Sequence, residues 1–128
     1  MAIDNSKYNE WFFQSDYDLE TAGYMFQSKR NIYCIFMCHL SIEKALKGLL
    51  VKSKGEYPPK THNLIYLADK IGIKFSDKYL EFIFTLNKVS VPTRYPDNLR
   101  KLISDFSDLR TKEILNTSKE IQEWIKGQ

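Results

Sequence analysis

Glycine and proline are scarce in this sequence, with five and four residues among 128. A β-sandwich of this length needs many short strands joined by turns, and those turns depend largely on these two residues. Their scarcity argues against a turn-rich β fold. It favours a few long elements, which we expect to be helices.

Long apolar runs are missing as well. No stretch approaches the roughly 20 apolar residues that are needed to cross a bilayer. Residues 1–10 are polar and contain no apolar segment of the kind found in a signal peptide. We therefore expect no membrane association and a cytoplasmic location.

Cysteine is too sparse for a metal site. The chain has two cysteines, Cys34 and Cys38, and only His39 lies beside them, whereas a structural metal site needs four suitably spaced ligands. On a helix, His39 would point about 100° away from Cys38. We expect both thiols to act as small apolar groups in the core or in an interface, and we expect neither a metal nor a cofactor.

A strong excess of one charge is absent, because 19 basic residues face 16 acidic residues, for a net charge of +3. Nucleic-acid-binding domains usually show a stronger, clustered basic excess, so composition alone does not indicate nucleic acid. Aromatic residues, in contrast, make up 14% of the chain. Most rings would fill the core, and rings left exposed often mark an interface. We therefore expect a homodimer formed through the long helices.

Apolar residues recur at helical spacing in five segments, which predicts an all-α fold. We expect an antiparallel, up-and-down bundle of about five helices in a single domain, residues 1–128. The predicted helices cover roughly residues 8–27, 33–53, 63–71, 77–89 and 107–126. The second helix is the most apolar and is expected at the centre of the bundle.

Cap and break residues predict where some helices begin and end. Thr61 is the predicted N-cap of the third helix. Pro92 is expected to close the fourth helix, because Pro92 and Pro96 do not belong in a helix interior. Residues 91–101 are therefore predicted to be irregular, followed by a lead-in turn or a short helix at residues 102–106.

Three local patterns follow one another along the chain. Residues 38–50, in the second predicted helix, contain Glu-Lys-Ala-Leu-Lys; residues 60–64 read Lys-Thr-His-Asn-Leu; residues 93–97 read Thr-Arg-Tyr-Pro-Asp. With Trp11 and the Asp-Leu-Glu-Thr-Ala at residues 18–22, they resemble the HEPN family (higher eukaryote and prokaryote nucleotide-binding domains). The resemblance spans nearly the whole chain.

This resemblance implies an antiparallel helical bundle that commonly dimerises and is connected with nucleotides or RNA. Family members are often encoded beside, or fused to, a minimal nucleotidyltransferase, and some are the ribonuclease toxins of toxin–antitoxin pairs. Those toxins carry an arginine followed four to six residues later by a histidine. No histidine follows Arg94, and the two histidines of this chain, His39 and His62, lie far upstream. The departure predicts a protein without nuclease activity.

The candidate ligand-binding residues gather around the third pattern. Arg94 offers a planar fork of donors for a phosphate, and Tyr95 offers a ring that stacks on a base or ribose. Asp97 can accept a hydrogen bond from a hydroxyl, and His62 titrates near neutrality. The alternative is a structural turn, in which Tyr95 packs, Asp97 caps and Arg94 pairs with an acidic residue. In that case His62 holds a loop through a hydrogen bond.

Lysines gather in the second predicted helix and the loop after it. Lys44 and Lys47 are the ligand-binding candidates among them, as part of a basic strip for an acidic ligand. The alternative is an ordinary solvated face. Glu43 precedes Lys47 by four residues, in the favourable order for an ion pair.

The sequence thus predicts a non-catalytic dimer that binds a nucleotide or RNA near Arg94 and works with a nucleotidyltransferase-type partner. One alternative is a metal-independent ribonuclease in which Arg94 acts with His62 or Tyr95. Another is a structural adaptor for a second protein, which would show a large apolar patch and no cleft at Arg94.

Overall fold

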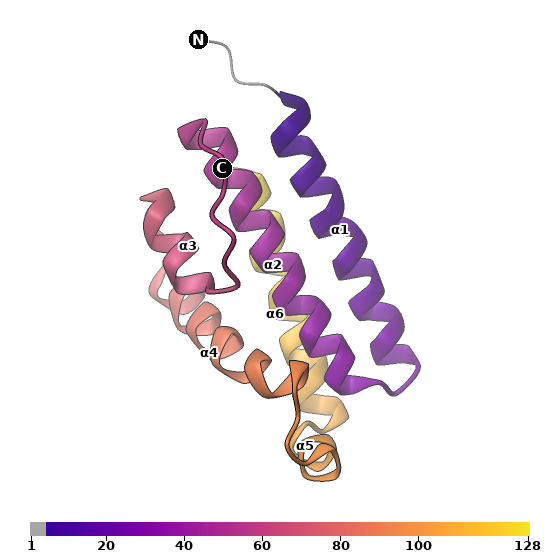
Figure 1. Ribbon diagram of the computed structural model, residues 1–128. Coiled ribbons are helices and arrows are strands. Elements are labelled where there is room, and N and C mark those ends of the chain that lie inside the picture. Colours follow the sequence, from indigo (N-terminus) through magenta and orange to yellow (C-terminus); the bar gives the residue numbers. More distant parts are fainter. Residues whose placement is uncertain (1–4) are drawn as a thin grey trace.

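The computed structural model describes residues 5–128, which form six α-helices and no strand (Figure 1). The helices are α1 Asn5–Gln27, α2 Asn31–Lys54, α3 Leu64–Ile71, α4 Asp77–Arg94, α5 Leu99–Asp105 and α6 Asp108–Lys126. The predicted all-α bundle is confirmed. The helix beyond the expected five is α5, which overlaps the lead-in turn or short helix predicted at residues 102–106 but begins three residues earlier, in the segment predicted to be irregular.

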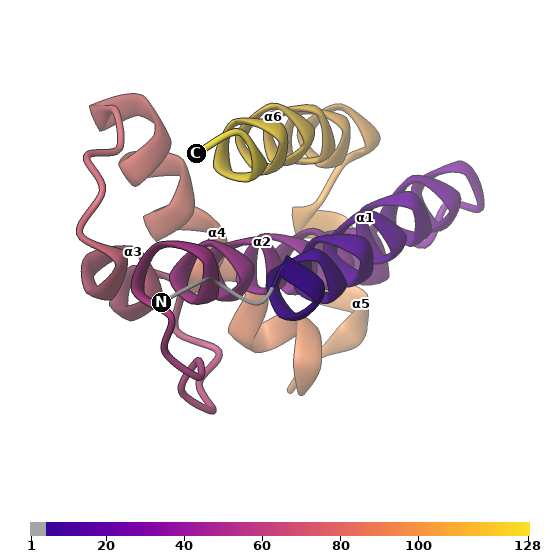
Figure 2. The same cartoon turned by 90° about the horizontal axis from the view of Figure 1, so that it is seen from above.

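Helix α2 runs through the centre of the bundle and contacts each of the other five helices. Helix α1 lies along one side of α2, α3 and α4 lie on the opposite side, and α6 covers a third side (Figures 1 and 2). Fifteen of the 24 residues of α2 are buried, so the prediction that this helix is central is confirmed. Cys34 and Cys38 are both free and buried within it, as expected.

Membrane-spanning helices and metal-binding groups are both absent from residues 5–128, the part of the chain that the structure describes. None of the helices in this range is both long and apolar enough to cross a membrane. The same residues contain no group of three or more histidine, cysteine, aspartate or glutamate side chains that is arranged to hold a metal ion.

Helices α1 and α2 pack closely because α2 carries a glycine at their contact. A Cβ atom at Gly48 would lie 2.6 Å from Cε1 of Phe12 and 3.0 Å from Cβ of Trp11. Real Cβ atoms do not approach other atoms so closely, and the ring of Phe12 is itself buried. The helix pair therefore requires glycine at this position, despite the cost of about 1 kcal/mol that glycine carries in a helix interior.

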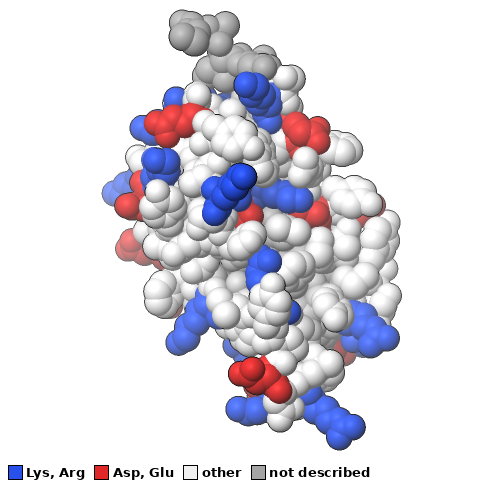
Figure 3. Space-filling model, viewed as in Figure 1, with Lys and Arg blue, Asp and Glu red and all other residues white. Residues whose placement is uncertain are grey.

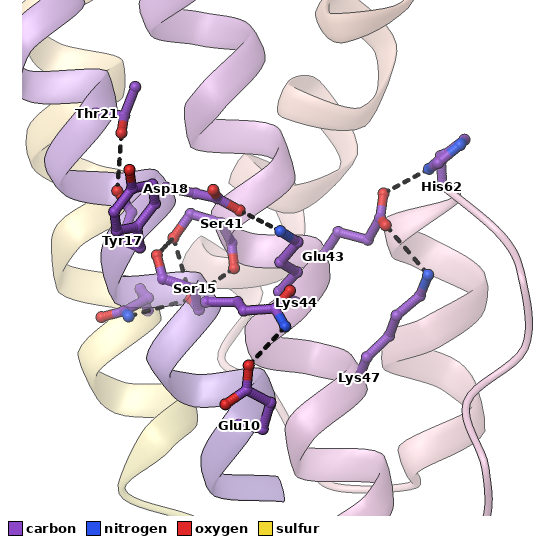
Figure 4. A network of polar contacts seen from close by, with 12 residues as sticks. Glu10, Ser15, Tyr17, Asp18, Thr21, Ser41, Glu43, Lys44, Lys47 and His62 are labelled. Carbon is purple, nitrogen blue, oxygen red and sulfur yellow. Dashed lines mark hydrogen bonds and ion pairs between the residues drawn. The ribbon is translucent and has the colours of Figure 1, made fainter. Parts of the chain in front are cut away.

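A small polar cluster joins α1, α2 and α6 inside the bundle (Figure 4). The hydroxyl of Ser15 donates to the backbone oxygen of Ser41 at 2.7 Å, and the hydroxyl of Ser41 donates to the backbone oxygen of Ser15 at 2.8 Å. The amide of Gln122 donates to Oγ of Ser15 at 3.1 Å. Because these buried polar atoms find partners, they fix the relative positions of the three helices at little net cost.

The N-cap of α3 is Asn63, so the prediction of Thr61 was wrong. The side chain of Asn63 accepts from the backbone N–H groups of Ile65 and Tyr66. Thr61 lies two residues earlier, where its hydroxyl accepts from the backbone N–H of Asn63 at 3.1 Å. Both residue types cap helices well, and here the threonine instead forms the turn that leads into the cap.

Helix α4 continues through Pro92 to Arg94, so the prediction that Pro92 closes it was wrong. Pro92 has no N–H group, so the helix lacks the one backbone hydrogen bond that this group would donate to the preceding turn. Two hydroxyl groups bond to the backbone around this proline, since Ser90 donates to the oxygen of Asn87 and Thr93 to the oxygen of Ser90. Arg94 therefore lies in the last turn of a helix, and the irregular segment shrinks to residues 95–98.

Candidate functional site

A cleft of about 330 Å³ opens between the middle of α2, the beginning of α3 and the second half of α4. Its walls combine imidazole, amide, hydroxyl and guanidinium groups with a few apolar side chains. The lining residues are His39, His62, Asn63, Asn87, Ser90, Val91, Arg94 and Tyr95. Three elements that are distant in sequence thus bring together three of the six predicted ligand-binding residues.

Arg94 reaches the cleft because α4 extends past Pro92. Its guanidinium carbon lies 4.6 Å from the centre of the Phe36 ring, which is a cation–π contact. Its Nη2 atom lies 3.4 Å from Nδ1 of His39 and 4.0 Å from Oε1 of Glu43. The side chain is one-fifth exposed, at 20%, so the guanidinium is held in place and still open to a ligand.

His39 lies beneath Arg94 and is almost completely buried. Its Nε2 atom is 3.5 Å from Oδ1 of Asn87. Burial lowers the pKa of His39 from 6.5 to about 4, with further lowering by Arg94 and His62 and an opposing effect of Glu43. The imidazole is therefore neutral at pH 7 and can accept a hydrogen bond from Arg94.

The carboxylate of Glu43 is the buried anion of the site, with its side chain 4% exposed. One oxygen lies 2.9 Å from Nδ1 of His62, and the other lies 3.1 Å from Nζ of Lys47 (Figure 4). Arg94 is the third neighbour, at 4.0 Å. Lys47 and Arg94 carry two permanent positive charges against one negative charge. The cluster therefore retains a positive excess.

His62 is held by the loop between α2 and α3, and its side chain is 68% exposed. A backbone hydrogen bond from Thr61 to Pro59 folds this loop, and the Asn63 cap fixes its other end. The bond from His62 to Glu43 turns the ring toward α2 (Figure 4). One edge of the imidazole is thereby engaged, while the rest of the ring faces the cleft and solvent.

The predicted ligand-binding residues separate into two groups. Arg94, Tyr95 and His62 line the cleft, with the Tyr95 ring 84% exposed at its rim. Asp97 is exposed in the turn after α4 and does not line the cleft. Its carboxylate is therefore not among the groups that meet in this space.

The two lysines also separate. Lys47 belongs to the cluster through Glu43. Lys44 turns toward α1 and pairs with Asp18 at 2.9 Å (Figure 4). On the face shown in Figure 3, basic and acidic residues alternate, without one dominant basic patch. Both lysines are largely buried and paired with carboxylates, so any electrostatic attraction at the cleft comes from the excess charge around Glu43.

Several residues of the site were not predicted as ligand-binding residues, and Phe36, His39 and Asn87 are those that form the surroundings of Arg94. His39 is four residues before Glu43, on the same helix face, and that spacing was the available signal. Asn87 is seven residues before Arg94, which also places the two on one face. Neither spacing reveals that α2 and α4 turn these faces toward each other.

A larger cavity, of about 450 Å³, lies between the start of α1 and the loop after α2. Its lining combines Trp11, Val51, Tyr57 and Pro58 with polar and charged side chains of α1. None of the predicted ligand-binding residues is among its lining residues. The smaller cleft at Arg94 therefore remains the better candidate site. A purely structural adaptor was expected to have no cleft at Arg94, so the presence of this cleft argues against that alternative.

Comparison with known proteins supports the same fold. A family model described as HEPN domain matches residues 8–128. The crystal structure of TT1696 from Thermus thermophilus is similar with a TM-score of 0.83 and 21% identity, covering 94% of this chain and 97% of that one. ST0689, an archaeal HEPN homologue, gives a TM-score of 0.73 and 22% identity, covering 94% and 95%. No curated protein matches the sequence.

Proposed function

The chain belongs to the HEPN family, and from this premise we propose that it is a nucleotide- or RNA-binding module whose cleft at Arg94 holds a phosphate group. The observation that carries this proposal is the guanidinium of Arg94, which stacks on Phe36 and lines the cleft together with His62. A planar guanidinium matches the geometry of phosphate oxygens through paired hydrogen bonds.

The local charges support a ligand of negative charge. Glu43 already accepts from His62 and Lys47, so it neutralises only part of the positive charge beside it. At 4.0 Å, its oxygen is too distant for a hydrogen bond with Arg94. Glu43 therefore does not engage the donors of Arg94, and those that do not contact His39 can serve an incoming phosphate.

Tyr95 is the proposed contact for the base. Its ring follows Arg94 directly and is exposed at the rim of the cleft. Aromatic rings beside a cationic group recur in proteins that bind single-stranded nucleic acids, because every base offers a face for stacking. The proposal gives no role to Lys44, whose pairing with Asp18 turns it away from the cleft, or to Asp97.

Calorimetric titration of adenosine monophosphate and of a short single-stranded RNA tests the proposal. Arg94→Ala should weaken binding by about tenfold to a hundredfold, because a hydrogen bond to a charged group contributes roughly 1.5–3 kcal/mol. Arg100→Ala, which removes an exposed arginine of α5, should leave the affinity unchanged. Binding that is equal in wild type and Arg94→Ala, or absent from the wild type, would exclude the proposed site.

We propose that the module is non-catalytic and acts as a homodimer with a nucleotidyltransferase-type partner, in a regulatory or toxin–antitoxin-like system. The proposed nucleotidyltransferase partner is supported by the family resemblance, because family members are often encoded beside such an enzyme. Exposed rings at Phe13, Tyr17 and Tyr24, on the outer face of α1, support self-association through a long helix. Light scattering in solution tests the dimer, and a monomer at all accessible concentrations would argue against it. Co-purification with the product of an adjacent nucleotidyltransferase gene tests the partner; its absence there would count against this pairing.

One observation favours a second candidate function, metal-independent RNA cleavage. His62 lines the same cleft as Arg94, although it lies 32 positions earlier in the sequence, and histidine is the usual group for proton transfer near neutral pH. Incubation with total RNA tests this role. Intact RNA at high protein concentration, or cleavage that persists in His62→Ala, would exclude it.

A further inference from the structure

A chain of polar contacts connects Arg94 with the first turn of α3. It begins at Nη2 of Arg94, passes through the ring of His39 at 3.4 Å, and continues at 3.5 Å to Oδ1 of Asn87. The same oxygen accepts from the backbone N–H of Leu64 at 2.8 Å. The amide nitrogen of Asn87 lies 3.5 Å from Oδ1 of Asn63, the cap of α3. Within this chain of contacts, the buried imidazole connects the guanidinium to the junction of α3 and α4.

The direction of these contacts fixes the proton on the imidazole. A guanidinium only donates hydrogen bonds, so Nδ1 of His39 must accept. A neutral imidazole then carries its proton on Nε2, which donates to the oxygen of Asn87. The orientation of that Asn87 amide is set independently, since the N–H of Leu64 requires an acceptor at this point. All donors and acceptors match in this one arrangement.

We infer that His39 is a positioning residue, whose neutral ring holds the guanidinium of Arg94 toward the cleft and connects it through Asn87 to α3. This inference rests on the proposed function, because it specifies how that site is prepared for its ligand. A free arginine side chain has many rotamers, and holding it in the binding geometry reduces the entropy lost when a ligand arrives.

A neutral acceptor suits this role better than a carboxylate would. A carboxylate in hydrogen-bond contact with Arg94 would hold the side chain but would also cancel its charge. Glu43, the nearest carboxylate, stays at 4.0 Å and is engaged with Lys47 and His62. His39 thus fixes the position of the guanidinium and leaves its charge to a phosphate.

Burial keeps the His39 ring neutral over a wide pH range. The ionisable groups that face it are Glu43 on the same helix, Arg94 on α4 and His62 on the loop before α3. Burial, aided by Arg94 and His62, outweighs the opposing effects of Glu43 and of the Asn87 hydrogen bond and lowers the pKa of His39 to about 4. The acceptor therefore persists through mildly acidic pH. Near pH 4, protonation would replace it with a donor that repels Arg94.

Two substitutions separate positioning from simple filling of the core. In His39→Asn, the side-chain oxygen can occupy the place of Nδ1 and accept from Arg94. In His39→Gln, the polar group reaches the place of Nε2, toward Asn87, and the acceptor beside Arg94 is lost. A third variant, His39→Leu, lacks both. All three are measured by titration with adenosine monophosphate at neutral pH, and urea unfolding identifies the folded variants.

We expect His39→Asn to bind within about twofold of wild type, and His39→Gln and His39→Leu to bind about tenfold more weakly, which corresponds to one hydrogen bond. If His39→Leu does not fold, the comparison of asparagine with glutamine is sufficient. Equal affinities for these two variants, or losses that follow urea stability rather than the acceptor position, would overturn the inference.

A second measurement needs no ligand, so it separates failure of this inference from failure of the proposed function. Long-range proton–nitrogen NMR correlations of the wild type report which ring nitrogen of His39 carries the proton. We expect an unprotonated Nδ1 whose resonance shifts in Arg94→Ala. A protonated Nδ1, or a resonance that does not respond to Arg94→Ala, would refute the positioning role. With the expected spectrum but no nucleotide binding, the positioning of Arg94 would stand and only the phosphate ligand would be rejected.

Discussion

Replacing Glu43 with leucine should lower the free energy of unfolding by about 3–5 kcal/mol, the usual effect of removing one partner from a buried ion pair. The side chain of Lys47 is 9% exposed, and its ammonium group lies 3.1 Å from the Glu43 carboxylate. Arg94 loses the same counter-ion at 4.0 Å. Without Glu43, two cations would remain close together with little water to solvate Lys47. Urea unfolding monitored by circular dichroism measures the change.

Two controls test this explanation. Glu43→Leu combined with Lys47→Met removes both members of the pair and should recover most of the lost stability, because two apolar side chains can replace a buried ion pair. Glu81→Leu, at an exposed position of α4, should change the stability by less than about 0.5 kcal/mol. A double variant that is no more stable than Glu43→Leu would show that the loss does not come from the unpaired lysine.

Lowering the pH from 7 to 4 should reduce the free energy of unfolding by about 3 kcal/mol through His39 alone. The pKa of His39 is about 4 in the native protein against 6.5 for an unperturbed histidine, and each unit of difference corresponds to about 1.36 kcal/mol. Between these two values the unfolded chain binds a proton that the native protein does not bind. Stability therefore rises with pH through this window and falls as the pH decreases.

The contribution of His39 appears as a difference between two proteins, since aspartates and glutamates also begin to titrate near pH 4. Wild type and His39→Asn are unfolded in urea at several pH values between 7 and 4. The wild type should lose about 3 kcal/mol more than the variant over this range. Parallel curves for the two proteins would mean that His39 is not buried as a neutral ring.

Much of the fold could be predicted from the sequence, because the helices of this bundle are strongly periodic. The second segment is apolar around most of its circumference, and it became the central helix α2. The end of α4 could not be predicted in the same way. A proline argues against a helix, yet α4 continues for two residues beyond Pro92. Whether the chain continues to Arg94 depends on the contacts of the last turn with α2.

The site was predictable as far as its residues lie within local patterns. Arg94, Tyr95 and His62 belong to such patterns, and the structure brings them to one cleft. His39 and Asn87 were not singled out, since each acquires its role from a helix distant in sequence. The sequence specifies the faces of α2 and α4 separately. Only their packing shows that the two faces meet.

Lys44 and Lys47 also show that a local sequence pattern does not reveal which neighbouring helix a side chain will face. Their spacing of three residues predicts that they share one helix surface. The same spacing, however, leaves the two side chains about 60° apart around the helix axis. In a central helix with neighbours on several sides, this angle suffices to separate them. Lys44 pairs with α1 through Asp18, and Lys47 pairs within α2 through Glu43.

The glycine at position 48 has a consequence for the far side of α2. Gly48 lies five residues after Glu43 in α2, and α1 packs against it on the side of α2 opposite α3 and α4 (Figure 2). A methyl group there would collide with Phe12 and Trp11, so α1 and α2 could not keep their present separation. The helix that carries His39 and Glu43 to the cleft thus owes its close seat against α1 to a single hydrogen atom on its opposite side.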